Sequence, residues 1–418
     1  VSVEQLLDCC SFYKVNGNWI PAAFSHVSIQ LPRLFPRGTK PSIDEFRELC
    51  RRLTSPTTYP RATAIQHNIP IYDLSTTANP SEALSRDLQD EWHHILYAGP
   101  GIVVLKGMYS PQRYGTILEL TNAAFQRIVD RENAQSSKRG DHFAAAGSND
   151  RIWNSFSKHA LEDAHSFVEY YSNPWLALVC EAWLGPGYRV TAQMNAVKPG
   201  GAAQNPHRDY HLGFQDSNAC ARFPLATQIA SQLLTLQGAV AHTNMPIDSG
   251  PTRFLPFSQL FESGYLAYRL KEFQDFFQEH YVALPLELGD AVFFNPALFH
   301  AAGANSTRDF SRKANLLQIS SAFGKPMESI DTLPLVKHTW DVLTAKYGAE
   351  GLSTGVKAFI SAIGEGYPFP TNLDNRPPAP NGMAPSSEQD VILQALKEGW
   401  DRERVVGELK KMRRDSAA

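Results

Sequence analysis

The 418-residue sequence is short of cysteine, of long apolar runs and of net charge of either sign. Its five cysteines include no C-x-x-C pair, which excludes a small disulfide framework and disfavours a zinc site built from paired thiolates. No apolar run reaches the roughly 18 residues that a membrane span needs, so we expect no membrane partner. Lysine and arginine number 39 against 42 aspartates and glutamates, a balance that disfavours nucleic acid as a partner.

The sparse cysteines also bear on the compartment. They are Cys9, Cys10, Cys50, Cys180 and Cys220. An odd number of unpaired-looking cysteines is typical of free thiols in a reducing environment. The first residues, VSVEQLLDCC, lack the basic-then-apolar order of a secretory signal. We therefore expect a cytoplasmic protein, and the sequence leaves its oligomeric state open, with a homodimer as one candidate.

What is present is enough apolar material for a large core, since 43% of the residues are hydrophobic and 11% aromatic. Residues 1–88 are expected to form an N-terminal extension with helices, the first of them over 43–53. A second helix is expected over 82–98, because Ser81 is a suitable N-cap and glycines follow the last turn. The β-branched run GIVVLKGM predicts a buried strand, and the periodic segment after it predicts an amphipathic helix.

The residue pattern changes near residue 188, where short strand-like runs alternate with Pro, Gly, Asn and Asp. These runs are 188–201, 223–244, 252–257, 281–296 and 312–323. Many short strands separated by turn signals predict an antiparallel sandwich or barrel. The segment 258–280 interrupts them and is expected to form one or two helices. We therefore predict a mainly β fold with flanking helices, with its core over 89–325.

The last part of the chain returns to helical periodicity. Residues 326–418 are predicted to form a helical C-terminal extension, with helices over 328–348 and 356–366. A linker near 367–388 is too rich in proline and asparagine to form a regular element. A mostly charged helix over 391–415 is expected to close the chain.

Three residues form the candidate chemical site. His207 and Asp209 lie two positions apart after a strand and a glycine-rich turn, and alternate residues of an extended segment project to the same side. His300 follows another apolar strand. Two imidazoles and one carboxylate make up the facial triad of non-haem Fe(II) oxygenases, which leaves coordination positions open.

Each part of this pattern also has a plain structural interpretation. A surface loop can contain His-x-Asp by accident, and a lone histidine at a strand end is more often simply packed. Arg312 strengthens the metal hypothesis, because a strand, a reversal and a returning strand would bring it beside His300. A fixed guanidinium near the metal suits the far carboxylate of a dicarboxylate cosubstrate. Strand parity alone does not separate Arg312 from Arg308.

At this point a family resemblance is visible. The segments AQNPHRD, IDSGPTRFLPFS and LELGDAVFFNPALFHAAGANSTRDFSRKANLLQIS resemble the phytanoyl-CoA dioxygenase family over roughly residues 89–325. The resemblance implies a double-stranded β-helix (jelly-roll) core and an enzyme that uses Fe(II), 2-oxoglutarate and O₂. It further implies iron binding by His207, Asp209 and His300, and 2-oxoglutarate binding by Arg312, Gln204 and Thr252.

The resemblance also implies a reaction class. We expect oxidation of an unactivated C–H bond of a small organic substrate, an amino acid or a specialised metabolite, with succinate and CO₂ as coproducts. Hydroxylation, desaturation and oxidative cyclisation all remain open as outcomes. His211 is expected either to contact substrate or to be a hydrogen-bonded structural histidine. One departure is visible: the family's Pro-Gly-Ser-His turn is Pro-Phe-Ser-Gln at 256–259.

Two rival hypotheses are kept. One is a different metal-dependent cupin-type enzyme that does not use 2-oxoglutarate, in which Arg312 and Gln204 would have no cosubstrate to hold. The other is a catalytically silent jelly-roll binding protein, against which the intact His-Asp-His set speaks. Production of succinate discriminates the leading hypothesis from both.

Overall fold

The structure is a computed structural model that describes residues 12–15, 18–21, 33–35, 38–77, 79–135 and 149–417. The chain divides into two compact units, Val1–Thr39 and Lys40–Ala418. In the first unit, strands β1 (Phe12–Val15) and β2 (Asn18–Pro21) form an antiparallel hairpin. The second unit contains every residue proposed above for the site.

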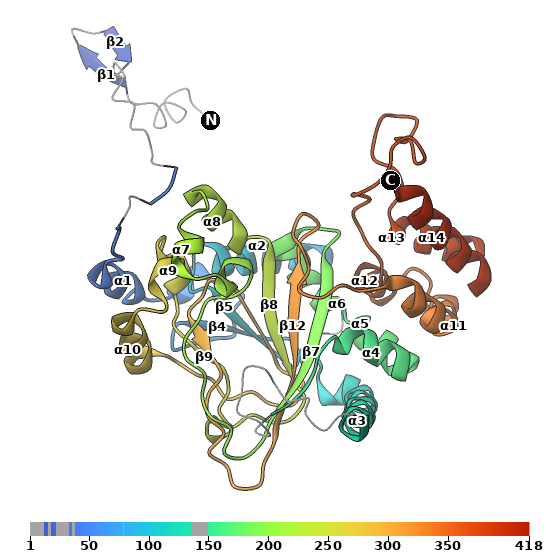
Figure 1. Cartoon of the computed structure of the whole chain (residues 1–418), viewed down its shortest axis with the longest axis horizontal. Coiled ribbons are helices and arrows are strands. Elements are labelled where there is room, and N and C mark those ends of the chain that lie inside the picture. Colours follow the sequence, from blue (N-terminus) through green and yellow to red (C-terminus); the bar gives the residue numbers. More distant parts are fainter. Residues whose placement is uncertain are drawn as a thin grey trace. The chain divides into compact units, whose positions relative to one another are not determined.

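An eight-stranded sheet forms the centre of the second unit, in the order β3-β4-β5-β10-β8-β12-β7-β6 (Figure 1). Its strands are β3 (Ala64–Gln66), β4 (Ile69–Asp73), β5 (Ile102–Lys106), β6 (Asn149–Ile152), β7 (Arg189–Val197), β8 (Thr235–Ala241), β10 (Ala291–Phe294) and β12 (Arg312–Ser320). All neighbours are antiparallel except β4 and β5. The long strands β7, β8 and β12 lie side by side.

The two faces of this sheet bury different partners, because side chains alternate along each strand. On one face, Val240 of β8 and Leu317 of β12 belong to a large apolar core shared with the helices. On the other face, Ala239 and Leu316 belong to a smaller apolar cluster with residues of the opposite layer. We call the first the helix-covered face and the second the cavity face.

The helices that pack on or around the helix-covered face follow local signals. They include α2 (Glu82–Tyr97), α3 (Pro111–Gln135), α4 (Ser155–Glu162), α5 (Ala164–Tyr171), α6 (Pro174–Leu184), α11 (Thr332–Glu350) and α12 (Thr354–Ile363). Ser81 caps α2 through a hydrogen bond from the Leu84 amide, as the sequence predicts. Ser42 does the same for α1 (Ile43–Cys50).

A two-stranded sheet faces the cavity from the other side. It pairs β9 (Arg253–Phe254) with β11 (His300–Ala301), and an isolated bridge joins Phe254 to Val282. Short helices lie in the other connections of the chain. These are η2 (Pro56–Thr58), η3 (His211–Phe214), α7 (Ser217–Cys220), α8 (Leu225–Gln232), η4 (Ile247–Ser249), η5 (Ser258–Leu260), α9 (Gly264–Ala267) and α10 (Lys271–His280).

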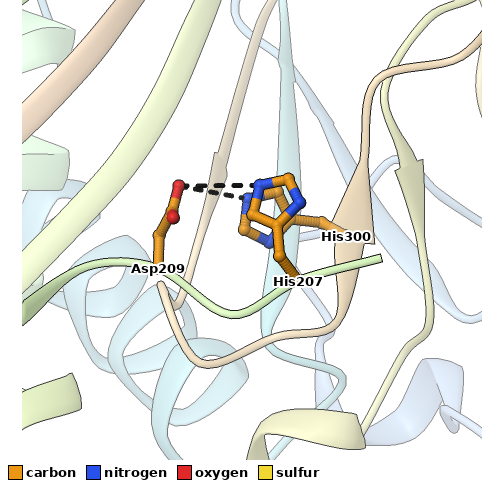
Figure 2. A group of neighbouring side chains, drawn as sticks. All are labelled: His207, Asp209 and His300. Carbon is orange, nitrogen blue, oxygen red and sulfur yellow. Dashed lines mark ion pairs between the residues drawn. The ribbon is translucent and has the colours of Figure 1, made fainter. Parts of the chain in front are cut away.

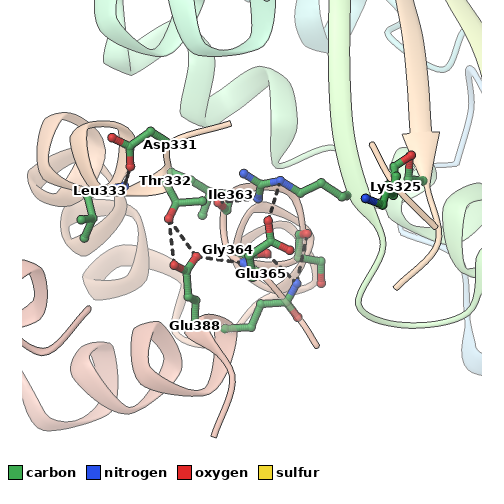
Figure 3. Close-up of polar contacts among 12 residues, drawn as sticks. Lys325, Asp331, Thr332, Leu333, Ile363, Gly364, Glu365 and Glu388 are labelled. Carbon is green, nitrogen blue, oxygen red and sulfur yellow. Dashed lines mark hydrogen bonds and ion pairs between the residues drawn. The ribbon is translucent and has the colours of Figure 1, made fainter. Parts of the chain in front are cut away.

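The C-terminal helices α11 to α14 are joined by a buried carboxylate, and Figure 3 shows its contacts with Thr332 and Glu365. Glu388, at the start of α13 (Glu388–Glu398), accepts hydrogen bonds from the Thr332 hydroxyl at 2.8 Å and from the Glu365 amide at 3.1 Å. Arg413 of α14 (Arg402–Ser416) donates to the same carboxylate at 3.2 Å. The Glu365 carboxylate in turn pairs with buried Arg189 at 3.1 Å, which ties this helical region to the first residue of β7.

Several predictions can be compared with these elements. The prediction of a mainly β protein is not confirmed, because the flanking segments form many helices and more residues lie in helices than in strands. The run 223–244 begins with α8 rather than a strand, since its first half follows a helical period. The closing helix is two helices, separated where Gly399 takes a left-handed backbone, φ +65°.

Other predictions concern boundaries and the membrane. The boundaries proposed at 88 and 325 stay predictions, because residues 40–418 cluster as one unit. Within the described ranges, no helix combines the length and apolarity that crossing a bilayer requires. Cys50, Cys180 and Cys220 are free thiols, whereas Cys9 and Cys10 lie outside the described residues.

Candidate metal and cosubstrate site

The two histidines of the proposed triad meet because their backbones are paired. His207 and His300 form an antiparallel bridge in which each amide donates to the other's carbonyl, at 3.0 and 3.1 Å. Residues directly opposite each other in such a pair project their side chains to the same side. The imidazole centroids consequently lie 4.4 Å apart, although the residues are 93 positions apart in sequence.

Asp209 joins this pair from the same extended segment. Its amide donates to the Pro296 carbonyl at 2.8 Å, which fixes the backbone two residues after His207. Its Oδ2 atom lies 3.8 Å from Nε2 of His207 and 3.6 Å from Nε2 of His300, as Figure 2 shows. One ligand atom from each of the three residues falls within 4.8 Å of the others, so the structure brings the predicted triad together.

The second nitrogen of each imidazole is already engaged. Nδ1 of His207 pairs with the Asn205 carbonyl at 3.0 Å, and Nδ1 of His300 pairs with the Leu298 carbonyl at 2.8 Å. A carbonyl partner requires a proton on Nδ1, which leaves Nε2 as a lone-pair donor directed at the common point. Metal-binding histidines are oriented in this way.

The ionisation of the site suits a cation. Burial lowers the pKa of His207, and the adjacent His300 lowers it further, so this imidazole is neutral at neutral pH. Burial by itself would raise the pKa of Asp209, but His207, His300 and the amide of Gln237 outweigh it, and the net shift is downward. A carboxylate and neutral imidazoles are the forms that coordinate a divalent metal.

Gln237 is a residue that the sequence reasoning missed. Its Nε2 donates to Asp209 Oδ2 at 2.8 Å, so it holds the carboxylate that completes the triad. The available signal was strand parity: Gln237 shares the cavity face of β8 with Ala239 and Ala241 and is polar in an otherwise apolar run.

Arg312 lies in the same cavity, and Arg308 does not. The Arg312 side chain is 6% exposed and donates to the carbonyl of Gly250, a residue whose positive φ of +73° suits glycine. Burial lowers the pKa of Arg312 to about 10, so the guanidinium keeps its charge at neutral pH. Among the described residues no carboxylate forms an ion pair with it. Arg308 is exposed and absent from the cavity lining.

The cavity around these groups has a volume of about 980 Å³ and also contains Gln204 and Thr252. Gln204 is held on both sides, since its Oε1 accepts from the Ala302 amide at 3.3 Å and its carbonyl accepts from Arg253 at 2.6 Å. Thr252 follows Gly250 in the turn that Arg312 contacts. Both predicted cosubstrate residues are thus on the cavity wall, and their roles stay predictions.

His211 and Arg208 leave the segment in other directions. His211 is not among the cavity-lining residues; its Nε2 lies 3.4 Å from the Thr235 hydroxyl and its ring packs on Tyr210. Its role as a substrate contact stays a prediction. Arg208 is buried and donates to the carbonyls of Ser258 and Phe261 at 2.7 and 2.9 Å. It therefore anchors the segment 207–209 on the side opposite to His207 and Asp209, because successive side chains of an extended segment point to opposite sides.

The altered turn at 256–259 supports the second histidine. The Ser258 hydroxyl accepts from the Phe299 amide at 2.8 Å, directly before His300, and Gln259 donates to the Gly99 carbonyl at 2.8 Å. The turn therefore keeps a structural role despite its departure from the family pattern.

The donor set fits both groups that the resemblance implies. Two imidazole nitrogens and a carboxylate suit Fe(II) with open positions. A buried guanidinium with no anionic partner among the described residues is costly unless a ligand neutralises it, and a second carboxylate of 2-oxoglutarate would do so. The residues present therefore fit iron and 2-oxoglutarate.

Comparisons with known proteins place the chain in a family. The family model for phytanoyl-CoA dioxygenase matches residues 97–314, just over half of the chain. The chain therefore belongs to the phytanoyl-CoA dioxygenase family, a family of Fe(II)/2-oxoglutarate-dependent dioxygenases. The predicted family and enzyme class are confirmed, and with them Fe(II), 2-oxoglutarate and O₂ as cofactor and cosubstrates.

Individual relatives are more distant. The dioxygenase andF of Emericella variicolor is 27% identical over 170 residues, which are 40% of this chain and 54% of that protein, so the match spans only about half of the relative. The α-ketoglutarate-dependent epimerase SnoN from nogalamycin biosynthesis is 20% identical, with a TM-score of 0.37 over 58% of this chain and 84% of that chain. The carbocyclase SnoK from the same biosynthesis is 18% identical, with a TM-score of 0.39 over 58% and 85%.

Proposed function

We propose that this protein couples the oxidative decarboxylation of 2-oxoglutarate to the oxidation of an unactivated C–H bond in a small organic molecule, an amino acid or a specialised metabolite. For hydroxylation, the substrate, 2-oxoglutarate and O₂ give the alcohol, succinate and CO₂; desaturation or ring closure gives water in place of the new hydroxyl. The observation that carries the proposal is the convergence of His207, Asp209 and His300 in one cavity with the buried guanidinium of Arg312, with which no carboxylate of the described residues forms an ion pair.

Each of these residues has a defined task in the proposal. His207, Asp209 and His300 would hold Fe(II), and Arg312 would hold the far carboxylate of 2-oxoglutarate, with Gln204 and Thr252 on the adjoining wall. When bound, iron and 2-oxoglutarate supply the oxidant that removes hydrogen from carbon.

The rest of the task falls to geometry. Gln237 keeps Asp209 in position, the paired backbones of His207 and His300 keep the imidazoles together, and the apolar lining keeps water from the reacting groups. We further propose that the central sheet and the β9–β11 pair are the two layers of a jelly-roll core.

The rival hypotheses each leave an observation without an explanation. A cupin-type enzyme without 2-oxoglutarate has no anion for the buried Arg312. A silent binding protein has no use for two imidazoles turned by backbone carbonyls toward one carboxylate. A homodimer stays a prediction.

Removal of a metal ligand tests the proposal. His207→Ala and Asp209→Ala should lower succinate formation from 2-oxoglutarate at least about a hundredfold and lower the iron bound per chain, because removal of a metal ligand costs no less than loss of its supporting partners. His93→Ala, at an exposed position of α2 outside the cavity lining, is the matched control and should retain wild-type succinate formation and iron content. Succinate formation within about tenfold of wild type in either ligand variant, in a protein that retains its circular dichroism spectrum, would refute the ligand assignment.

A further inference from the structure

One half of the cavity wall is built from carboxamides. On the cavity face, Gln237 of β8 is paired in register with Gln318 of β12, and Asn195 of β7 is paired with Ala314 of β12. Gln193 of β7 is paired with Leu316 of β12, between the Gln318 and Ala314 positions of that strand. The other half of the wall, on β5 and β10, is apolar. The polar groups therefore form one patch, the amide wall, defined here as Gln193, Asn195, Gln237 and Gln318.

This amide wall carries unpaired acceptors. The Oε1 atoms of Gln237 and Gln318 and the Oδ1 atom of Asn195 are buried and accept no hydrogen bond from the described residues. Gln237 and Asn195 are 3% and 8% exposed. The orientation of the Gln237 amide is set by its donation to Asp209, so its oxygen faces away from the carboxylate as an acceptor. A buried polar atom without a partner is costly, and three on one cavity wall indicate a ligand that supplies donors.

The same wall carries no formal charge. Of the cationic groups that line the cavity, Arg312 serves the cosubstrate in the proposed function, and Arg269 donates to the Gln215 and Gly213 carbonyls at 2.6 and 3.1 Å. Arg151 lies at the edge, paired in register with Asn195 and stacked over Trp153 at 5.0 Å. Neutral acceptors select hydroxyl and N–H groups, whereas an anionic substrate would be recognised through Arg151.

We infer that the substrate is a neutral, carbon-rich molecule with at least two hydroxyl groups, which donate to the oxygens of Gln237, Gln318 and Asn195, while its hydrocarbon part packs on the apolar half of the wall. This inference rests on the proposed function, because it assigns the amide wall to the substrate of that reaction. The cavity volume of about 980 Å³ lies in the upper range of small-molecule sites and accommodates such a molecule beside 2-oxoglutarate.

The first experiment measures retention of three probes that share one rigid skeleton. Androstane, androstanediol and androstane carboxylic acid are equilibrated anaerobically with the full chain loaded with Fe(II) and 2-oxoglutarate, and bound probe, iron and 2-oxoglutarate are quantified together by mass spectrometry. We expect the diol to bind about five- to tenfold more tightly than the hydrocarbon and the acid. In Asn195→Leu and Gln318→Leu this preference should fall about three- to tenfold, while retention of androstane is unchanged or higher.

The second experiment separates recognition from a structural role. Since an unpaired buried amide stabilises nothing, Asn195→Leu and Gln318→Leu should leave the melting temperature of the ligand-free chain unchanged or raise it. The matched control is Asn315→Leu on β12, because Asn315 faces the helices and donates to the Tyr170 and Tyr171 hydroxyls at 3.4 and 3.3 Å. That variant should melt at a lower temperature.

The outcomes divide cleanly. Three results, each obtained with iron and 2-oxoglutarate bound, would overturn the inference. They are preferential binding of the carboxylic acid that Arg151→Gln abolishes, equal retention of the three probes, and retention of none of them. Melting of Asn195→Leu and Gln318→Leu as low as that of Asn315→Leu overturns it as well. Absence of bound iron or 2-oxoglutarate in the wild-type chain contradicts the proposed function instead, so the two failures are distinguishable.

Discussion

Two asparagines on neighbouring strands of the central sheet differ in their hydrogen bonding. Asn315 of β12, on the helix-covered face, donates to two tyrosine hydroxyls and accepts from the Ser155 hydroxyl at 3.4 Å. Asn195 of β7, on the cavity face, has a buried oxygen with no partner among the described residues. An asparagine side chain thus completes a hydrogen-bond network on one face, whereas on the other face an asparagine oxygen accepts no hydrogen bond from the described residues.

This difference extends to the charged groups of the two sides. On the helix side, the buried carboxylate of Glu388 accepts from a hydroxyl, an amide and a guanidinium. On the cavity side, the buried guanidinium of Arg312 donates to the Gly250 carbonyl and forms no ion pair with a carboxylate of the described residues. Asn315 and Glu388, which join helices, thus have hydrogen-bond partners, whereas the Asn195 oxygen and the Arg312 guanidinium, which line the cavity, lack a donor and a carboxylate respectively among the described residues. This lack of partners carries a cost to the stability of the ligand-free state.

The largest effect is expected on the helix side, at Glu388. Replacement by alanine leaves Thr332, Arg413 and the Glu365 amide without their common acceptor, and we expect a loss of about 3–5 kcal/mol in the free energy of unfolding. Chemical denaturation measures it. Glu408→Ala, at an exposed position of α14, should change the free energy by less than about 0.5 kcal/mol. An equal change in the free energy of unfolding for Glu388→Ala and Glu408→Ala would contradict the stabilising role of the Glu388 carboxylate.

A somewhat smaller effect separates the two asparagines. Asn315→Leu removes the hydrogen bonds to the Ser155 and Tyr171 hydroxyls and one of the two to the Tyr170 hydroxyl, which keeps His242, and we expect a loss of about 2–4 kcal/mol. Asn195→Leu should lose less than about 0.5 kcal/mol, or gain stability, because it removes an oxygen that had no partner. Denaturation with urea of both variants sharpens the comparison, and the reverse order of stabilities would break it.

A third effect is a pH dependence on the helix-covered side. Burial, with the charges of His159 and Lys313, lowers the pKa of His242 to about 3, while the imidazole pairs with Tyr170 and Asn122. Below pH 6.5 the unfolded chain binds a proton that the folded chain does not, so this contribution to stability is present above that pH and is lost as the pH falls toward 3. Between pH 7 and pH 5 it amounts to about 2 kcal/mol.

The variant His242→Gln isolates the contribution of His242 to the pH dependence of stability. It should lose about 2 kcal/mol less than wild type over the same pH interval, measured by urea denaturation at each pH. An identical pH dependence in the two proteins would contradict this, because it would mean that His242 takes up its proton over the same pH range in the folded and unfolded chains.

Much of the site could be predicted because its signals are local. The two-residue spacing of His207 and Asp209 fixes a shared side, and the turn before Arg312 places that residue near His300. The helices α1 and α2 were predictable for the same reason, since caps and apolar periodicity lie within a few residues of each helix.

What could not be predicted depends on distant pairing. The bridge between His207 and His300 sets the distance between the imidazoles, and no pattern in either segment specifies it. Arg312 is the buried first residue of β12 and contacts the turn at Gly250, whereas Arg308 lies exposed in the loop before that strand, and the sequence does not show which of the two meets that distant turn. The helical half of 223–244 was missed because a short apolar run suits either a strand or a helix until its neighbours are known.

The central claim is that the cavity holds iron and 2-oxoglutarate together, and anaerobic titration tests it most directly. Addition of Fe(II) and then 2-oxoglutarate to the purified chain should produce their charge-transfer absorption at one equivalent of each. Arg312→Ala should weaken 2-oxoglutarate binding by about 1.5–3 kcal/mol, and Arg308→Ala should leave it unchanged. No charge-transfer band in the wild-type chain, or an effect of Arg308→Ala in place of Arg312→Ala, would contradict the account.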